Sequence, residues 1–473
     1  MARRIQTLVL LGTGLLVCVA LSLVSGSETQ GANQSPTANA GPNLSGIVGQ
    51  AITLDGSGST DPDGTIVRYH WEQLFPSKTS TTYVTSNPVT LSAPASAVTS
   101  FTPQWPGNYR FILTVVDNAG AESSSTVDVT VRFAVSPLPP QGAELDANWF
   151  FDDPAYLTWV IPALKRLHIT YAVISPYLCM PSRTADRVEY LDPSGSDPRG
   201  ATVSDDDLKH LINLCHDNRI SVVLKPMLNP DWTHPFDRSE MQPTDWNAWF
   251  ASYQAMIVHY AQIAADTGVE LFCIGSENWT TESHTQLWRG VIAAVRAIYH
   301  GPITYESCSI RFEGNQWDVK FWDALDYIGV SAFIEGSGTE RDPTGRLEDP
   351  TLDQMKTNID RIYTATVGQV AVRYNKKVLF IEAGCCTADW GNCYPSMWNQ
   401  DQLRTELGKT FSLDYGERST YFEALLEVVA RHPEIEGVFW WELRDLHQLP
   451  MDLSVLSEPV ATLLSIWYGT ATQ

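Results

Sequence analysis

Short runs of alternating apolar and polar side chains fill the first third of the chain. Examples are residues 51–54, 66–70 and 125–131, and Gly, Asp and Asn residues separate the runs. Alternation with a period of two is typical of half-buried strands, whereas a helix needs a longer segment with apolar residues three or four positions apart. We find no such segment there and predict an antiparallel all-β sandwich over residues 37–133.

The pattern changes after residue 143, where short apolar strands alternate with helical segments. We predict strands at 143–149, 170–175, 221–227, 269–276, 303–308, 327–333, 377–382 and 437–442. Helical patterns occupy 155–167, 204–216, 246–267, 284–299, 317–324, 352–374, 419–431 and 458–467. Eight strand–helix units favour a closed α/β (β/α)8 TIM barrel over residues 143–470. An open doubly wound sheet normally has a Gly-rich first turn, and the turn at DANWF (146–150) has none.

Three further segments connect or precede these two domains. Residues 134–142 include SPLPPQG, a Pro-rich linker that favours an extended chain. Residues 27–36 are small and polar and are predicted to be a disordered leader. Residues 1–26 combine Arg3, Arg4 and an apolar run, which is the composition of a signal peptide. We therefore expect a secreted or cell-surface protein, with an uncleaved membrane anchor as the alternative because a clean Ala-x-Ala site is missing.

The charge of the chain narrows the classes of partner. The chain has 54 acidic against 31 basic side chains, a formal net charge of −23. Such a surface repels phosphate backbones, so we expect no nucleic-acid partner. A neutral polysaccharide is not repelled, and 16 Trp and 18 Tyr residues offer the flat aromatic faces that carbohydrate sites use. The sequence has no metal-binding or nucleotide-binding motif, and we expect a monomer without a cofactor.

Two glutamates end strands of the predicted barrel. GSENW places Glu277 after the fourth strand, and FIEAG places Glu382 at the end of the seventh. Active sites of such barrels lie at the C-terminal ends of the strands. Retaining glycoside hydrolysis needs two carboxyl groups about 5–5.5 Å apart, one protonated and one ionised. Carboxylates on the fourth and seventh strands face one another across the barrel mouth, which predicts a glycosidase site.

The N-terminal segment resembles a PKD-type immunoglobulin-like domain. The matching motifs are ANAGPN (38–43), LDGSGSTDPDGTIVRYHWEQ (54–73) and YRFILTVVDNAG (109–120). The resemblance implies an immunoglobulin-like sandwich with Trp71 in its core. We expect this domain to be dispensable for chemistry, because it has no acid/base pair and a linker follows it.

The predicted barrel resembles glycoside hydrolase family 113. The motifs are VVLKP (222–226), the segment from WNAWF to GPITY (246–305), FWDALDYIGVSAF (321–333) and VLFIEAG (378–384). The resemblance implies a retaining (β/α)8 enzyme of a β-mannanase family. It also implies Glu277 as the acid/base and Glu382 as the nucleophile.

Five further residues are candidates for contact with the sugar. Lys225 ends the third strand in the LKP motif and is expected to bind a sugar hydroxyl or a carboxylate, with a structural salt bridge in the mouth as the alternative. Of Trp440 and Trp441 on the eighth strand, one is expected to stack on the sugar while the other packs against helices. Trp149 and Ser276 lie near the predicted mouth, after the first strand and at the end of the fourth.

Three departures from the family pattern affect the predicted substrate. The family usually has Thr where Ser276 stands and Tyr where Phe333 stands, and the fifth strand ends YESCS (305–309) without the family's Asn. We expect hydrolysis of β-linked polysaccharide, with β-mannan as the first choice and endo-β-1,4-mannanase-like action. The alternatives are another β-glycan as substrate, or a non-catalytic carbohydrate-binding or cell-surface protein on a glycosidase barrel.

Seven cysteines follow the predicted signal peptide, and three of them lie in CCTADWGNC (385–393). Export to an oxidising compartment would favour one disulfide there, most simply between Cys393 and either Cys385 or Cys386. A zinc site is less favoured, because the segment lacks paired CxxC or HxxxH spacing.

Overall fold

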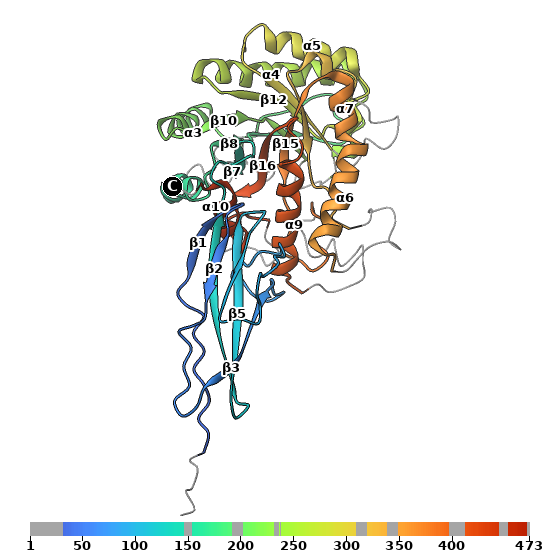
Figure 1. The fold of residues 1–473 in the computed structure, drawn as a ribbon. Helices are drawn as coiled ribbons and strands as arrows, with labels where there is room; N and C mark the ends of the chain where they lie inside the picture. The colour runs from blue at the N-terminus through green and yellow to red at the C-terminus, as the bar shows by residue number, and fades with distance from the viewer. Residues whose placement is uncertain are drawn as a thin grey trace, which may run out of the picture.

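A computed structural model shows two domains, a β-sandwich and a barrel, joined by a short connection (Figure 1). The residues it describes are 32–145, 154–191, 202–230, 236, 238–308, 319–337, 349–396, 412–443 and 453–470. The predicted signal peptide and Trp149 therefore lie outside the described residues. Within the described part, no helix is long and apolar enough to cross a membrane.

The N-terminal domain is a two-sheet β-sandwich, as predicted. One sheet has the strand order β1-β6-β5-β3, and the other pairs β2 with β4. The strands are β1 (Leu44–Ile47), β2 (Ile52–Asp55), β3 (Ile66–Leu74), β4 (Val98–Phe101), β5 (Gly107–Asp117) and β6 (Glu122–Arg132). Burial alternates along most of β5, which is the pattern on which the prediction depended. Trp71 on β3 is buried in the core with Tyr109, Phe111 and Leu113.

Eight parallel strands close into a barrel, which confirms the predicted TIM-barrel class. Around the barrel they are β7 (Gln141–Leu145), β8 (Tyr171–Ile174), β10 (Ser221–Leu224), β12 (Leu271–Ser276), β13 (Ile303–Cys308), β14 (Tyr327–Ser331), β15 (Lys377–Ala383) and β16 (Ile435–Leu443). A separate two-stranded ladder pairs β9 (Tyr177–Met180) with β11 (Met227–Pro230). Because the barrel strands are parallel, their carboxyl ends meet at one rim.

Helices surround the barrel (Figure 1). They are α2 (Pro154–Arg166), α3 (Asp205–Asp217), α4 (Trp246–Thr267), α5 (Thr285–Arg296), α6 (Leu352–Ala365), α7 (Val367–Tyr374), α9 (Tyr415–Val429) and α10 (Val460–Tyr468). Short 3-10 turns are η1 (Arg238–Glu240), η2 (Trp279–Thr281) and η4 (Trp322–Ala324). Capping sets the ends of α4: Asp245 accepts hydrogen bonds from its first turn, and Gly268 closes it at φ 75°. The helix expected at 317–324 is only the turn η4 in the described part.

The sandwich packs along α9 and α10 (Figure 1). Tyr83 donates a hydrogen bond to Glu423 Oε1 at 2.5 Å, and Ser86 N–H donates to Glu423 Oε2 at 2.8 Å. Trp105 of the sandwich stacks on Trp467 of α10, with 5.8 Å between ring centroids. The helix α9 is consequently buried along its whole length after Tyr415, which an outer barrel helix facing water would not be. The two domains therefore share a buried interface with polar and aromatic contacts.

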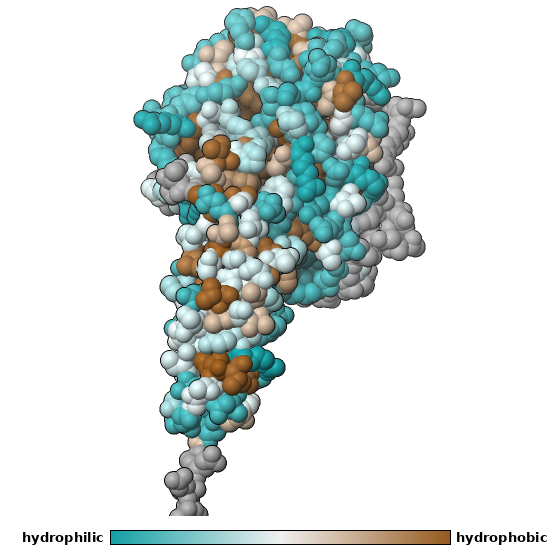
Figure 2. Space-filling model, in the orientation of Figure 1, coloured by the Kyte–Doolittle hydropathy of each residue, from teal (hydrophilic) through white to brown (hydrophobic). Residues whose placement is uncertain are grey.

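The outer surface differs between the two domains. The face in Figure 2 is mainly hydrophilic over the barrel, and apolar patches lie on the sandwich. Exposed apolar side chains of the sandwich include Val67 at 63% and Phe75 at 52%. Single exposed apolar residues are ordinary on soluble domains, so they define no binding surface.

Candidate active site

The carboxyl ends of β12 and β15 carry the two predicted glutamates. Glu277 follows β12 directly, and its N–H donates to Glu306 O at 2.8 Å. Its φ of 50° lies in the left-handed region. Such a conformation costs a non-glycine residue on the order of 1–3 kcal/mol and is often found at functional sites. Glu382 is the penultimate residue of β15. Both side chains therefore start from the rim where sites of such barrels form.

A β-bulge changes the direction of Glu382. An apolar cluster with residues from five barrel strands fills the barrel interior, and Ile381 belongs to it. Strict alternation along β15 would then point Glu382 outward, toward the helices. The register with β14 shifts at this point, because Val330 pairs with Phe380 whereas Ser331 pairs with Glu382. The extra residue turns the Glu382 side chain inward, toward the other charged groups of the mouth.

Lys225 joins three carboxylates in the mouth. It follows β10, two positions after Val223 of the interior cluster, and its side chain is fully buried. Its Nζ lies 2.5 Å from Glu382 Oε1, 3.2 Å from Glu144 Oε2 and 3.3 Å from Glu306 Oε2. These contacts are the structural salt bridge that was the alternative for Lys225, and a contact of Lys225 with the sugar stays a prediction.

Burial and the shared lysine set the protonation of these carboxyl groups. Burial raises the pKa of Glu382, the charge of Glu306 raises it further, and Lys225 lowers it. Burial raises the pKa of Glu144 to about 8, with Lys225 acting against the shift. Burial alone would lower the pKa of Lys225, but the neighbouring carboxylates raise it well above its usual value. With a pKa of about 8, Glu144 is mostly protonated near neutral pH, which leaves the charge of Lys225 to Glu306 and Glu382.

Glu277 has a different environment. Burial raises the pKa of Glu277, Arg238 lowers it, and the charge of Glu382 raises it again. Arg238 of η1 donates from Nη2 to Glu277 Oε2 at 3.0 Å. This guanidinium is partly exposed, whereas the ammonium beside Glu382 is fully buried. Burial thus raises the pKa of both glutamates, and a different cation opposes the rise at each of them.

Trp441 lies at the mouth, whereas Trp440 lies in the helix layer. The Trp441 ring is half-buried, and its centroid is 5.3 Å from Lys225 Nζ. Trp440 is fully buried, donates from Nε1 to Gln141 Oε1 at 2.8 Å, and packs on Phe422 of α9. The structure thus corrects the inclusion of Trp440 among the sugar-contact candidates and leaves Trp441.

Ser276 lies behind the mouth rather than open to it. Its side chain is fully buried, and its Oγ has no hydrogen-bond partner among the described residues. The neighbouring Asn278 is also buried and donates from Nδ2 to the Tyr253 hydroxyl at 3.2 Å. Trp149, the remaining candidate, lies outside the described residues.

Three charged residues of the mouth were not among the predicted site residues. Glu144 and Glu306 stand in apolar strands, the same signal that identified Glu277. Glu306 was noticed in YESCS only as a departure from a family pattern. Arg238 lies in a short turn, and no pattern in the sequence around it indicates a contact with Glu277.

The disulfide expected after β15 is absent. Cys385 and Cys386 carry free thiols. The Cys385 Sγ lies 3.5 Å from the carbonyl oxygen of Cys386, and the Cys393 Sγ lies 3.0 Å from Ser337 Oγ. The expected bond between Cys393 and either neighbour is therefore wrong in this structure, because the thiols are turned to different partners.

Comparison with family models assigns both domains. The model of Glycoside Hydrolase Family 113 matches residues 160–450, and a model of the PKD domain matches residues 40–131. Among curated proteins, the dyslexia-associated protein KIAA0319-like protein of Mus musculus is 39% identical over 92 residues, which are 19% of this chain and 8% of that protein. Collagenase ColQ1 of Bacillus cereus (strain Q1) is 33% identical over 106 residues, 22% of this chain and 9% of that protein. The chain thus spans less than a tenth of the length of these relatives.

Solved structures share the barrel fold. A structure described as a complex of GH113 β-1,4-mannanase is 22% identical, with a TM-score of 0.55, and the match covers 70% of this chain and 97% of that one. The GH113 β-mannanase AaManA from Alicyclobacillus acidocaldarius, in complex with ManMIm, is 23% identical with a TM-score of 0.56. That match covers 71% of this chain and 97% of the other.

Proposed function

The chain belongs to glycoside hydrolase family 113, and from this premise we propose that it is a secreted, retaining enzyme that cleaves β-linked polysaccharide. β-Mannan is the proposed substrate, with endo action on β-1,4 bonds. The observation that carries the proposal is the pair of Glu277 and Glu382, which end β12 and β15 beside different counter-charges.

Glu382 is the proposed nucleophile. Lys225 Nζ binds its Oε1 and favours the ionised form, so we assign attack on the anomeric carbon to Oε2. As the glycosidic bond breaks, the proton of Glu277 passes to the leaving oxygen. The products of this step are a glycosyl ester on Glu382 and a shortened glycan with a free hydroxyl.

Water completes the reaction in a second step. Glu277, now a carboxylate, takes a proton from the water whose oxygen attacks the anomeric carbon. The ester bond breaks, and Glu382 returns to its ionised form beside Lys225. Two inversions at one carbon give retention. Because Glu144 holds a proton near neutral pH, the charge of Lys225 remains available to Glu382.

The choice of a glycan rests on the family and on Trp441. An aromatic face beside Lys225, the partner of Glu382, can stack on the apolar face of a pyranose ring. The related β-mannanases suggest mannan, although at 22% and 23% identity they share only the fold with this chain. Secretion is proposed from the composition of residues 1–26.

Hydrolysis of defined glycans tests the proposal. The purified chain is incubated with β-mannan, glucomannan, β-glucan, xylan and chitosan, and released reducing ends are measured. The variants Glu277→Gln and Glu382→Gln are the matched controls, since each removes one carboxyl group and little volume. We expect the native chain to release reducing ends from β-mannan, and we expect both variants to lose this activity. Binding without release by the native chain would instead identify a non-catalytic carbohydrate-binding protein.

The mechanism is tested by the configuration of the first product. Proton NMR of freshly cleaved oligosaccharide should show the β-anomer before mutarotation. An α-anomer formed first would contradict double displacement, even if hydrolysis itself is confirmed.

A further inference from the structure

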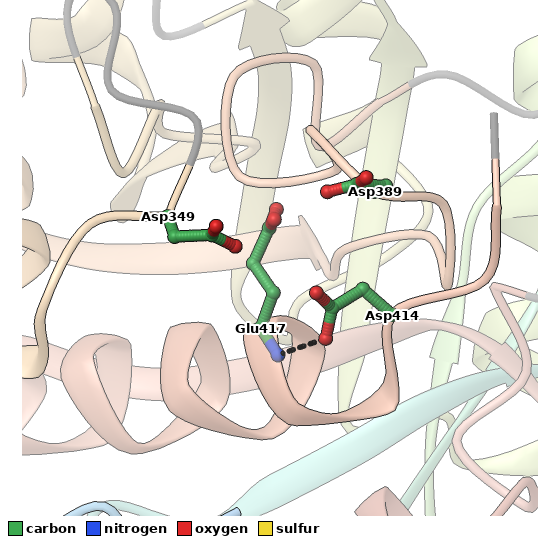
Figure 3. Close-up of side chains that lie close together, drawn as sticks. All are labelled: Asp349, Asp389, Asp414 and Glu417. Carbon is green, nitrogen blue, oxygen red and sulfur yellow. Dashed lines mark hydrogen bonds between the residues drawn. The ribbon is translucent and has the colours of Figure 1, made fainter. Parts of the chain in front are cut away.

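A lysine of the sandwich lies inside an acidic cluster of the barrel. The carboxylates of Asp349, Asp389, Asp414 and Glu417 turn toward one another in Figure 3, and one oxygen of each lies within 4.8 Å of the others. The Nζ of Lys78 lies 2.6 Å from Asp349, 3.3 Å from Asp414 and 3.6 Å from Asp389. An ammonium group therefore already occupies the position that a metal ion would need in this cluster.

The backbone of Lys78 is docked as well. Tyr415 N–H at the start of α9 donates to Lys78 O at 3.0 Å. A Cβ on Gly416 would come within 3.2 Å of the Ser77 carbonyl group, so only glycine allows this approach without a shift. Asp414 caps α9 by accepting from Glu417 N–H at 2.8 Å, the bond drawn in Figure 3. The first turn of α9 thus connects Lys78 with the acidic cluster.

The cluster also holds the loop that follows Glu382. Glu417 accepts hydrogen bonds from Trp390 N–H at 3.2 Å and from Asn392 N–H at 2.8 Å. Asp389 N–H donates to Ser412 O at 2.9 Å. The loop of residues 384–396 is therefore held at its backbone by Glu417, and Lys78 pairs with Asp389 and Asp414 beside it.

The loop in turn supports the mouth. A small apolar cluster lies inside it, formed by Cys386, Ala388, Cys393, Tyr394 and Leu453. Trp390 and Trp441 both pack against this cluster, and Trp441 lies over Lys225. Gly384 brings the loop close to the strand, since a Cβ there would lie 2.8 Å from Trp441 O.

We propose that Lys78 is a positioning residue through which the sandwich domain holds the Trp390 loop and Trp441 in place for the glycan. The inference rests on the proposed function of the mouth. Without Lys78, the four carboxylates face one another with no counter-charge from the sandwich, and their repulsion opens the loop. The chemistry at Glu277 and Glu382 is not touched directly, so substrate binding is the step that suffers.

Two measurements on the full chain test this inference. The variants are Lys78→Met, the charge-keeping Lys78→Arg, and Lys377→Met as the matched control. The side chain of Lys377 is as exposed as that of Lys78, and it pairs with Glu436. Lys377 begins β15, so it lies at the opposite end of this strand from Glu382. Hydrogen exchange of the backbone amides of residues 386–396 reports on the loop without any substrate. Steady-state kinetics on mannan oligosaccharides report on the mouth.

In Lys78→Met, we expect the loop amides to exchange at least about threefold faster. We expect KM to rise about threefold to tenfold while kcat stays within about twofold. Lys78→Arg and Lys377→Met should behave like the native chain in both measurements.

Unchanged exchange in Lys78→Met would overturn the inference whatever the activity, and so would faster exchange with an unchanged KM. If the native chain cleaves no glycan, the proposed function fails. Faster loop exchange confined to Lys78→Met would then still support the link between the sandwich and the loop.

Discussion

Replacing Lys225 with Met removes an ammonium group from a fully buried position and keeps an unbranched side chain of similar length. Glu144, Glu306 and Glu382 then lose their shared counter-charge. Removing one partner of a buried ion pair costs about 3–5 kcal/mol of stability. Loss of one preorganised electrostatic contact in an active site lowers turnover by about 10²–10³-fold. We expect both effects in this variant.

The pH dependence of Lys225→Met has a defined sign. Lys225 lowers the pKa of Glu382, so its removal raises that pKa. The nucleophile must be ionised, and the acid limb of kcat/KM should therefore move to higher pH. Buried carboxyl groups with a raised folded-state pKa favour the folded state below their unfolded pKa. That contribution is lost as pH rises through the folded pKa. Thermal unfolding of the variant should therefore show a larger loss of stability toward alkaline pH than the native chain.

The assay is kcat/KM and thermal unfolding of the native chain, Lys225→Met and Lys377→Met from about pH 4 to pH 9. Lys377→Met should match the native chain, since it removes only an exposed ion pair and an exposed hydrogen bond to Pro433 O. If Lys225→Met retains kcat/KM within about tenfold and its acid limb does not move, Lys225 does not set the charge of the nucleophile.

Four further variants test the same structure. Glu382→Gln should reduce turnover to below about one per cent of the native value, since no glycosyl-enzyme can form. Glu277→Gln should reduce turnover of glycans about 10²–10⁴-fold. Its effect on aryl glycosides should be much smaller, because their leaving group needs no proton. Glu144→Gln should keep most activity, and its unfolding temperature should gain on that of the native chain as pH rises from about 4.5 to about 8, because Glu144 has a pKa of about 8 in the fold and glutamine cannot ionise. Deleting residues 32–140 should lower the unfolding temperature by on the order of 10 °C, since α9 loses the Tyr83 and Trp105 contacts; an unchanged temperature would contradict the shared interface.

The sequence was sufficient to predict those features that depend on a short stretch of neighbouring residues. The eight barrel strands were recognisable from apolar runs, and Glu277 and Glu382 from their places at strand ends. The choice between Trp440 and Trp441 could also have been made by counting. Phe439 faces the barrel interior, so Trp441, two residues later, faces the same way. The same counting fails for Glu382, because a bulge reverses the direction of its side chain and no residue pattern marks that bulge.

Contacts between distant segments could not be predicted. Glu144 and Glu306 come from two different strands, and both pair with the ammonium group of Lys225, which follows a third strand. This meeting depends on distances that the sequence does not contain. The predicted disulfide in the loop of residues 385–393 was wrong for a related reason. Proximity of Cys385, Cys386 and Cys393 along the chain says nothing about where their thiols point.

The Pro-rich linker at 134–142 marks a domain boundary, but the two domains are not separate in space. A linker allows domains to act separately only if they have no surface that must be buried together. Glu423 is buried completely, and its hydrogen bonds come from Tyr83 and Ser86 of the sandwich. Without the sandwich, α9 would expose a face that includes Thr420 and a carboxyl group whose pKa burial has raised to about 7. The sandwich therefore completes the packing of α9, and because α9 also holds the loop after Glu382, the effect of the sandwich extends to the rim of the barrel.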